Sequence, residues 1–136
     1  MLYFLSERGV FGMAQEVSVE KLKFHGLLRP AMKYIEENCL RADLSMGEIA
    51  DICGISEVYF RKLFLKQTGV APKQYIIDKR IEEAERLLSE GKMKIYAISE
   101  KCGFANQYHF SRLFRKKTGF TPSQYRRKER IRRLDK

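Results

Sequence analysis

The stretch ICGISEVYFRKLFLKQTGVAPKQY, residues 52–75, returns later in the chain as KCGFANQYHFSRLFRKKTGFTPSQY, residues 101–125. The two copies align at an offset of 49 residues up to the pair Gly54 and Gly103, and at an offset of 50 residues from the pair Phe60 and Phe110 onward. One residue has therefore been added in the second copy before Phe110. Two copies are too few for a solenoid, so the repeat predicts two similar subdomains.

Each copy has the pattern of a helix, a glycine-containing turn and a second helix, which is typical of a helix-turn-helix. In the first copy Ser45 and Glu48 form a predicted capping box at the start of the first helix, and Gly54 ends that helix. In the second copy Lys94 stands where Ser45 stood, so the sequence offers no side-chain cap at that helix start.

The second helix of each pair begins at a residue whose side-chain oxygen can accept a hydrogen bond from an unpaired backbone N–H. Ser56 is the predicted N-cap in the first copy, and Asn106 has the matching place in the second copy. Gly69 and Gly119 mark the predicted ends of these helices, because glycine adopts the left-handed conformation that closes a helix.

These second helices have two faces of different chemistry when residues are placed at about 100° intervals. One face is apolar and largely aromatic, and we interpret it as core; it consists of Phe60, Leu63 and Phe64 in the first copy and of Phe110, Leu113 and Phe114 in the second. The outward face or its flank holds Val58, Arg61, Lys62 and Leu65 in the first copy, and Tyr108, Ser111, Arg112 and Arg115 in the second. Function is expected on the outward faces.

A longer helix is predicted between the copies, from Pro72, which suits a first turn, to Gly91. Its apolar residues recur at helical spacing at Ile77, Ile81, Ala84 and Leu88. About 18 residues span about 27 Å at about 1.5 Å per residue, and helices that enter successive major grooves of B-DNA lie about 34 Å apart. Since the flanking units add width, one chain can fill two successive grooves.

Further helices are predicted at both ends of the repeat. Thr121, Pro122 and Gln124 combine an N-cap, a first-turn proline and a capping-box partner, and they begin a basic C-terminal helix. Upstream, LLRPAMKYIEENC, residues 27–39, predicts one more helix whose inward residues are Ala31, Met32 and Ile35. The first twenty or so residues show no clean period.

The charge of the chain predicts an anionic partner, because 27 Lys and Arg against 17 Asp and Glu leave a formal net charge of +10. Charge alone leaves both nucleic acid and an anionic membrane open. The basic residues concentrate between Arg112 and the C-terminus, so this end is expected near phosphates or as a solvated tail. No apolar run approaches the roughly 18 residues that a membrane span needs, so we expect a cytoplasmic protein with no membrane partner.

An enzyme is the main alternative from another class, and the residue inventory argues against it. The two histidines lie far apart, and neither a glycine-rich phosphate loop nor a metal-ligand cluster is present in the sequence. Cys39, Cys53 and Cys102 are odd in number and form no CxxC pair, so we expect buried thiols rather than disulfides or a zinc site. The sequence predicts no catalytic residue, no metal and no cofactor.

An RNA-binding or purely architectural protein is a second alternative, since either would also use a basic helical surface. RNA readers usually present stacking aromatic side chains on a sheet or a loop. The phenylalanines of the two predicted second helices fall on the core faces instead, which favours a protein that binds double-stranded DNA.

The stretch GISEVYFRKLFLKQTGVAPKQYIIDKRIEEAERLL, residues 54–88, followed by GFANQYHFSRLFRKKTGFTPSQYRR, residues 103–127, resembles the AraC/XylS family of bacterial transcription regulators. The resemblance covers roughly residues 28–128. It implies an all-α fold of about seven helices, in which two homeodomain-like helix-turn-helix subdomains are joined by a long linker helix. It also implies sequence-specific DNA binding for the regulation of transcription.

The resemblance divides the chain into residues 1–27, a linker or the remnant of an upstream domain; residues 28–70, the first subdomain; residues 71–91, the linker helix; and residues 92–136, the second subdomain with its basic C-terminal helix. The partners that it implies are double-stranded promoter DNA, RNA polymerase, and an effector-binding or dimerisation domain for which this sequence has no room. We therefore expect a stand-alone member of the family or the DNA-binding fragment of a longer regulator.

The family's base-contacting positions fall on the outward faces described above. They are Val58, Arg61 and Lys62 on the first recognition helix, and Gln107, Tyr108, Ser111 and Arg112 on the second. Arginine can bind guanine through two hydrogen bonds, glutamine can bind adenine in the same way, and valine can pack against the thymine methyl group. For Arg61, Lys62 and Arg112 a solvated surface or a salt bridge to a neighbouring helix remains the alternative.

Phosphate contacts are expected from helix N-termini and from the basic rims. The candidates are Ser56, Lys66, Lys73, Asn106, Arg115, Lys116, Lys117 and Arg126. His109 stands where the first copy keeps Tyr59, on the boundary between the two faces, and is expected to pack rather than to bind a metal or sense pH.

Overall fold

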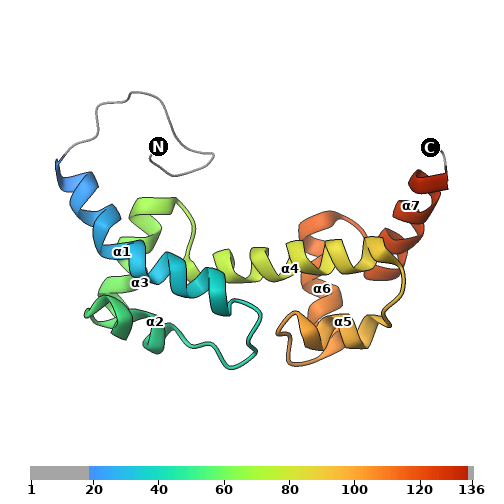
Figure 1. Cartoon of the computed structure of the whole chain (residues 1–136), viewed down its shortest axis with the longest axis horizontal. Coiled ribbons are helices and arrows are strands. Elements are labelled where there is room, and N and C mark those ends of the chain that lie inside the picture. The colour runs from blue at the N-terminus through green and yellow to red at the C-terminus, as the bar shows by residue number, and fades with distance from the viewer. Residues whose placement is uncertain (1–18, 135–136) are drawn as a thin grey trace.

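The computed structural model describes residues 19–134, with side chains from Gly26 onward, and over this range the chain forms seven helices and no strand. The helices are α1 (Val19–Asn38), α2 (Met46–Cys53), α3 (Glu57–Thr68), α4 (Pro72–Glu90), α5 (Ile95–Lys101), α6 (Gln107–Thr118) and α7 (Pro122–Leu134). Helix α4 runs along the long axis, with α1–α3 at one end and α5–α7 at the other (Figure 1). We call these groups of three helices the first unit and the second unit. The all-α fold expected from the sequence is confirmed.

The predicted caps set most of the helix boundaries. The capping box of α2 is present, since the backbone N–H of Glu48 donates to Ser45 Oγ and that of Ser45 donates to Glu48 Oε1, both at 3.1 Å. Ser56 Oγ and Asn106 Oδ1 accept the backbone N–H groups of Tyr59 and His109 at 3.1 and 2.7 Å. The turn glycines that end α2, α3, α4 and α6 have φ between 70° and 87°.

Helix α1 begins at Val19, earlier than the predicted helix over residues 27–39, so part of the expected linker is helical. Its buried residues include Ala31 and Ile35, as the sequence predicts, while Met32 is half-buried at the edge of the core. The proposed linker character of residues 1–18 lies outside the described residues.

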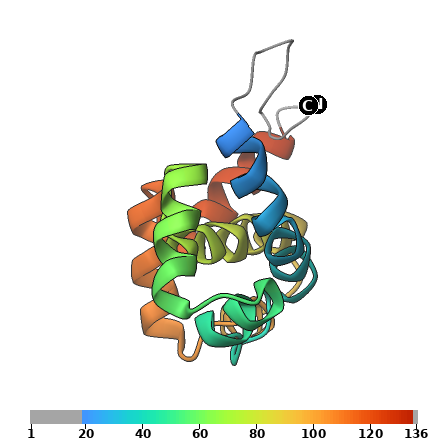
Figure 2. The same cartoon turned by 90° about the vertical axis from the view of Figure 1, so that its left-hand side faces the viewer.

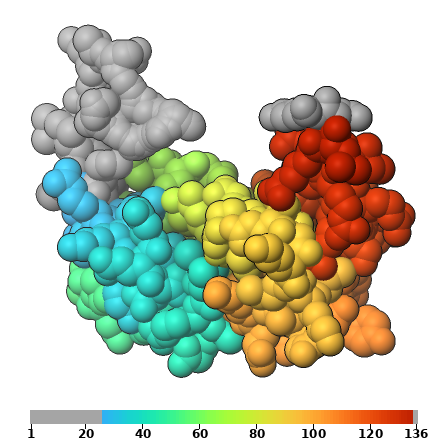
Figure 3. Space-filling model, turned by 45° about the vertical axis from the view of Figure 1, so that its right-hand side comes forward, coloured from blue at the N-terminus to red at the C-terminus, as the bar shows by residue number. Residues whose placement is uncertain are grey.

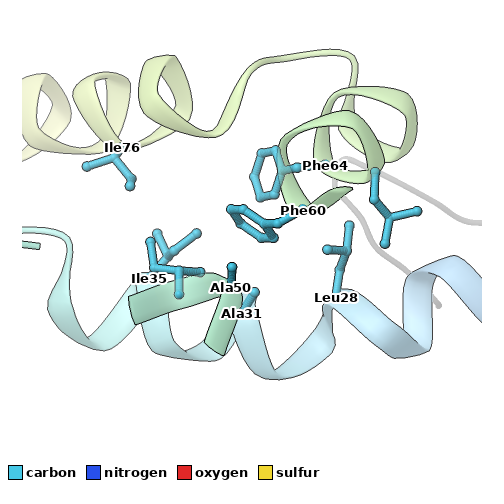
Figure 4. Packing of buried hydrophobic residues seen from close by; sticks show 9 residues of the cluster. Leu28, Ala31, Ile35, Ala50, Phe60, Phe64 and Ile76 are labelled. Atoms are coloured by element: carbon cyan, nitrogen blue, oxygen red, sulfur yellow. The ribbon is translucent and has the colours of Figure 1, made fainter. Parts of the chain in front are cut away.

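The core of the first unit joins α1, α2, α3 and the start of α4 (Figure 4). Its buried members are Leu28, Ala31, Ile35, Ile49, Ala50, Phe60, Leu63, Phe64 and Ile76. The ring of Phe64 meets the ring of Tyr75 edge-on, with centroids 5.4 Å apart. The prediction that Phe60, Leu63 and Phe64 form the inward face of α3 is therefore confirmed.

The second unit repeats this packing around the rest of α4. Its buried members are Ile81, Ala84, Leu87, Leu88, Ile98, Cys102, Phe104, Phe110 and Phe114. The ring of Tyr125 stands edge-on to Phe114 with centroids 5.3 Å apart, which reproduces the pair Phe64–Tyr75. Leu113 is half-buried against this cluster rather than fully buried like Leu63.

The apolar face of α4 changes its partner along the helix. Ile76, which is 4% exposed, belongs to the first core, whereas Ile81, which is 1% exposed, belongs to the second. Ile77 was expected in the buried stripe, but it is only half-buried at the edge of the second core. The buried residues of α4 therefore do not form one continuous apolar face, because its start packs against the first core and the rest against the second.

The three cysteines differ in burial. Cys102 is fully buried, whereas Cys39 and Cys53 are only half-buried, so the expectation of three buried thiols is wrong for two of them. Both half-buried residues lie at helix ends, Cys53 as the last residue of α2 and Cys39 one residue after α1. None of the helices described is both long enough and apolar enough to cross a membrane.

The capping carboxylate of Glu48 also joins α2 to α1. The Tyr34 hydroxyl donates to Glu48 Oε2 at 2.5 Å, and the Arg41 guanidinium donates to the same oxygen at 3.1 Å. These bonds stabilise the ionised carboxylate, so the Tyr34 hydroxyl, the Ser45 N–H and Arg41 together lower the pKa of Glu48 to about 2.

A group whose pKa is lowered by folding stabilises the folded state above its ordinary pKa, and that stabilisation is lost as the pH falls through the folded-state value. We therefore expect Glu48→Gln to lower the thermal unfolding midpoint by a constant amount above about pH 5, because the ordinary pKa is about 4.3. The difference should shrink towards zero near pH 2. In a Tyr34→Phe background the effect of Glu48→Gln should vary less with pH, because one of the hydrogen bonds that lower the pKa of Glu48 is missing. An effect of Glu48→Gln at pH 2.5 as large as at pH 7 would contradict the assignment.

Candidate nucleic-acid interface

Helices α3 and α6 lie on the same side of the molecule. Figure 1 places them at opposite ends of α4, and Figure 2, seen along the long axis, shows both on one side of it. Each presents to solvent the face opposite its phenylalanines. The duplication therefore produces two outward helix faces on one surface of the chain.

The outward face of α3 holds both apolar and charged side chains. Val58 is 65% exposed and Leu65 is 51% exposed, although both are large and apolar. Arg61 and Lys62 are exposed beside them. The Arg61 guanidinium pairs with the Glu57 carboxylate one turn earlier, at 2.5 Å, so its salt bridge lies within its own helix.

Glu57 also belongs to this outward face of α3, and it is not among the residues that the sequence predicts for the site. An acidic residue in the first turn of a helix is ordinary, because it complements the helix dipole. The signal that identifies it is its spacing of four residues from Arg61, which allows the two side chains to pair on one face. At the matching position the second copy has Gln107, which carries no charge.

The outward face of α6 is more exposed and has a different composition. Tyr108 is 89% exposed, the highest value among the large apolar or aromatic side chains described. Gln107 and Arg112 are exposed as well, and Ser111 is half-buried. An open hollow on this face is lined by Asn106, Tyr108, His109, Ser111, Arg112, Arg115 and Thr121.

The expectation that His109 packs between the two faces is wrong. Its side chain is exposed, as are all residues from Asn106 to Tyr108. The matching Tyr59 of α3 is 45% exposed as well, so this position faces solvent near the start of both helices. His109 is thus part of the outward surface.

Seven of the eight residues expected to contact phosphate fall into three groups. Lys66, Lys73, Arg115 and Lys116 are exposed. Ser56 and Asn106 use their side-chain oxygens to cap their own helices. Lys117 pairs with Asp78 of α4 at 3.5 Å.

The eighth residue, Arg126, makes a contact within the protein. Its guanidinium is half-buried and donates a hydrogen bond from Nη2 to the backbone carbonyl of Met93, in the loop before α5. Burial lowers the pKa of the Arg126 guanidinium. The side chain thus fastens α7 to the α4–α5 loop.

The two units differ sharply in charge. Residues 28–70 contain six Lys or Arg and six Asp or Glu, whereas residues 92–134 contain thirteen Lys or Arg and only two Asp or Glu. The positive charge is thus concentrated in the second unit, on α6 and α7. This is the side of the molecule that attracts polyanions most strongly.

The cysteines have no features of a reactive or metal-bound set. Burial raises the pKa of Cys102 to about 12, and burial also raises the pKa values of Cys39 and Cys53. Such thiols are protonated and poorly nucleophilic at neutral pH. Within residues 19–134 no group of three His, Cys, Asp or Glu side chains is placed to hold a metal ion.

Known proteins share this arrangement. The family model described as a helix-turn-helix domain matches residues 49–128, more than half of the chain. A crystal structure of a transcriptional regulator from Chromobacterium violaceum, described as AraC-type DNA-binding domain-containing, matches with a TM-score of 0.69 and 28% identity. The match covers 79% of this chain and 96% of that one. The chain belongs to the AraC/XylS family of helix-turn-helix transcription regulators.

Two further relatives of this AraC-type chain are informative. It is 35% identical over 110 residues to YobQ of Bacillus subtilis (strain 168), an uncharacterized HTH-type transcriptional regulator, covering 76% of this chain and 44% of YobQ. The DNA-binding domain of AdpA, a global transcriptional factor crystallised with a target DNA, matches with a TM-score of 0.72 and 27% identity. That match covers 79% of this chain and 98% of the domain. This chain thus spans less than half the length of YobQ.

The assignment of faces on α6 predicts that two neighbouring aromatic substitutions differ greatly in their effect on stability. Tyr108→Ala should change the free energy of unfolding by no more than about 0.5 kcal/mol, because the ring is exposed. Phe110→Ala should cost about 3 to 5 kcal/mol, because it empties the centre of the second core. Urea unfolding measures both, and a similar cost for the two variants would contradict the assignment.

Proposed function

We propose that this chain binds double-stranded promoter DNA by placing α3 and α6 in successive major grooves, and that it regulates transcription by doing so. The observation that carries this proposal is the presence of two exposed helix faces on one side of a linker helix. Helix α4 has 19 residues, which span about 28 Å at about 1.5 Å per residue. The likeness to the AdpA domain, which was crystallised with a target DNA, supports the proposal.

Helix α3 reads bases with Val58, Arg61 and Lys62. An arginine can donate two hydrogen bonds to guanine, and an exposed valine can contact the thymine methyl group. Glu57 holds the Arg61 guanidinium in place in the free protein and can itself accept a hydrogen bond from the cytosine amino group. The two side chains therefore suit a site that contains a G·C base pair, with Arg61 on the guanine and Glu57 on a cytosine.

Helix α6 reads bases with Gln107, Tyr108, Ser111 and Arg112. Gln107 suits adenine and Arg112 suits guanine. Because these four side chains differ from those of α3, the two helices recognise different base sequences. The site is then an asymmetric pair of half-sites rather than a palindrome.

Phosphate contacts come from the exposed basic residues around these faces and from the first-turn N–H groups of both helices. The side chains are Lys66, Lys73, Arg115, Lys116 and Lys117. Ser56 and Asn106 contribute by capping the helix starts that face the backbone. We leave Arg126 out, because its guanidinium is engaged with Met93.

The remaining partners follow from the family and from the length of the relatives. We propose that residues 28–70, 71–91 and 92–136 are the two DNA-reading units and their linker helix. We further propose that they act in the cytoplasm together with RNA polymerase and with an effector-binding or dimerisation domain outside this chain. No catalytic role is proposed.

Selection of DNA from a random pool tests the proposed function directly. The enriched sequences should contain two different conserved segments whose centres lie about one helical turn, 10 to 10.5 base pairs, apart. The selected duplex should then be displaced far better by itself than by random duplex or RNA at fixed salt. Equal displacement by random DNA would refute the proposal.

The salt dependence of binding tests the phosphate contacts. The logarithm of the association constant should fall with the logarithm of the salt concentration by about 0.9 for each phosphate neutralised. Lys116→Ala should weaken binding to all sequences alike and reduce that slope by about one. Lys33→Ala, in an exposed residue of α1, is the matched control and should change neither quantity.

Arg61 and Glu57 provide a test of base reading. Arg61→Ala should relax the preference at one base pair by about 1 to 3 kcal/mol. Glu57→Gln, which copies the second repeat, should raise affinity for random DNA and lower discrimination, because it removes a negative charge that repels phosphate and orients Arg61. Equal weakening of selected and random DNA by Arg61→Ala would show that Arg61 does not read a base.

A further inference from the structure

The linker helix is built mainly into the second unit. Four of its buried residues, Ile81, Ala84, Leu87 and Leu88, lie in the second core. In the first core it contributes Ile76 as a buried residue and Tyr75 at the edge. Together with Pro72, which is buried in the first turn, these contacts all lie within the first five residues of α4, so they hold only one end of the helix against the first unit.

The Arg80 side chain adds a polar attachment between α4 and the first unit. Its Nε donates to the carbonyl of Cys39 at 2.7 Å, and its Nη2 donates to the carbonyl of Arg41 at 2.6 Å. Both carbonyls lie just after the end of α1, where the helix dipole places partial negative charge. The guanidinium is half-buried there, and burial lowers the pKa of Arg80.

The opposite side of the same guanidinium faces the second unit. Its centre lies 6.0 Å from the centroid of the Phe104 ring, within the range of a cation–π contact. A Cβ atom on Gly103 would lie 2.7 Å from the carbonyl oxygen of Leu40 and 2.9 Å from Arg80 Nε. The turn between α5 and α6 is thus pressed against both Arg80 and the loop between α1 and α2.

The views of the whole molecule agree with these contacts. The α1–α2 loop and the α5–α6 turn approach each other beneath α4 in Figure 1. In Figure 3 the surface of the first unit, in cyan and teal, meets the yellow and orange surface of α4 and α5. Gly54, the counterpart of Gly103 in the first copy, also has a positive φ but has no atom within 4 Å of its Cβ position.

We propose that Arg80, seated between the α1–α2 loop and the α5–α6 turn, is a positioning residue that fixes the angle between the units. Through that angle it sets the spacing of half-sites that the chain accepts. The second part of this proposal rests on the proposed DNA-binding function. One added base pair moves a half-site by about 3.4 Å and rotates it by about 34°, so a rigid pair of helices accepts only one spacing.

Arginine suits this place better than lysine does. The planar guanidinium can direct separate N–H groups at two fixed carbonyls while its face rests on an aromatic ring, whereas the ammonium group of lysine is a single point charge. Arg80→Lys should therefore keep part of the fixed orientation between the units that Arg80→Met loses. A role limited to net charge would make Arg80→Lys equal to the wild type.

The first experiment measures the angle without DNA. Residual dipolar couplings of the backbone amides in the full chain report the orientation of each unit. A single alignment tensor should fit both units of the wild type, whereas Arg80→Met should require two tensors while circular dichroism shows both variants to be folded. A single tensor for Arg80→Met would overturn the proposal whether or not the chain binds DNA.

The second experiment measures spacing on duplexes that carry the two selected half-sites at the natural distance or shifted by one or two base pairs. Linking two binding modules gains about 10²- to 10⁴-fold in affinity, so the wild type should lose about 100-fold at a shift of two base pairs. For Arg80→Met the natural site should bind more weakly, and the loss on shifting should fall below about tenfold.

Controls separate this role from DNA contact and from folding. Binding of Arg80→Met to a duplex with a single half-site should stay within about twofold of the wild type, because Arg80 does not lie on the DNA-reading faces. Gly103→Ala should flatten the spacing profile as Arg80→Met does. Gly54→Ala, which strains a glycine with the same sign of φ but makes no contact between units, should leave the profile sharp. A sharp profile for Arg80→Met, or a flat one for Gly54→Ala, would overturn the proposal.

Discussion

The guanidinium of Arg80 is the point at which the first unit, the linker helix and the second unit meet. It donates hydrogen bonds to the carbonyls of Cys39 and Arg41, while Phe104 and Gly103 lie against its other side. Each unit has its own hydrophobic core, so neither needs the other in order to bury its phenylalanines. In our proposal the polar contact of Arg80, rather than a shared core, sets how the two outward helix faces are placed relative to each other. Both faces can bind one DNA site at the same time only when that relative placement is fixed.

The two copies share the aromatic part of the core and differ on their outward faces. The edge-on ring pairs Phe64–Tyr75 and Phe114–Tyr125 have nearly the same geometry in the two units. On the outward faces Glu57 has become Gln107, and the neutral first unit has a strongly basic counterpart. Close packing tolerates few exchanges in the core, whereas solvent-exposed positions are free to diverge. One fold thus supplies two outward helix faces of different chemistry, one with an exposed ion pair and one with surplus positive charge.

Local features of the sequence predict most of this fold, because their causes are local. The capping box of Ser45 and Glu48 and the phenylalanine faces act over one or two helical turns and could be located from spacing alone. Ile77 and His109 were placed wrongly, because helical periodicity does not say where a helix changes its packing partner or which boundary residues the neighbouring helices cover. Arg126 and Arg80 both look like surface charges in the sequence. Their carbonyl partners lie 33 to 41 residues away along the chain, and no local pattern reveals such contacts.

The central claim is that one chain presents two helices of different chemistry to successive major grooves. Methylation of guanine N7 reports major-groove contact, so dimethyl sulfate protection of the selected duplex by the full chain tests the claim most directly. The account predicts two clusters of protected guanines on one face of the DNA, with centres about 10 to 10.5 base pairs apart. A single protected cluster, or two clusters on opposite faces of the helix, would contradict it.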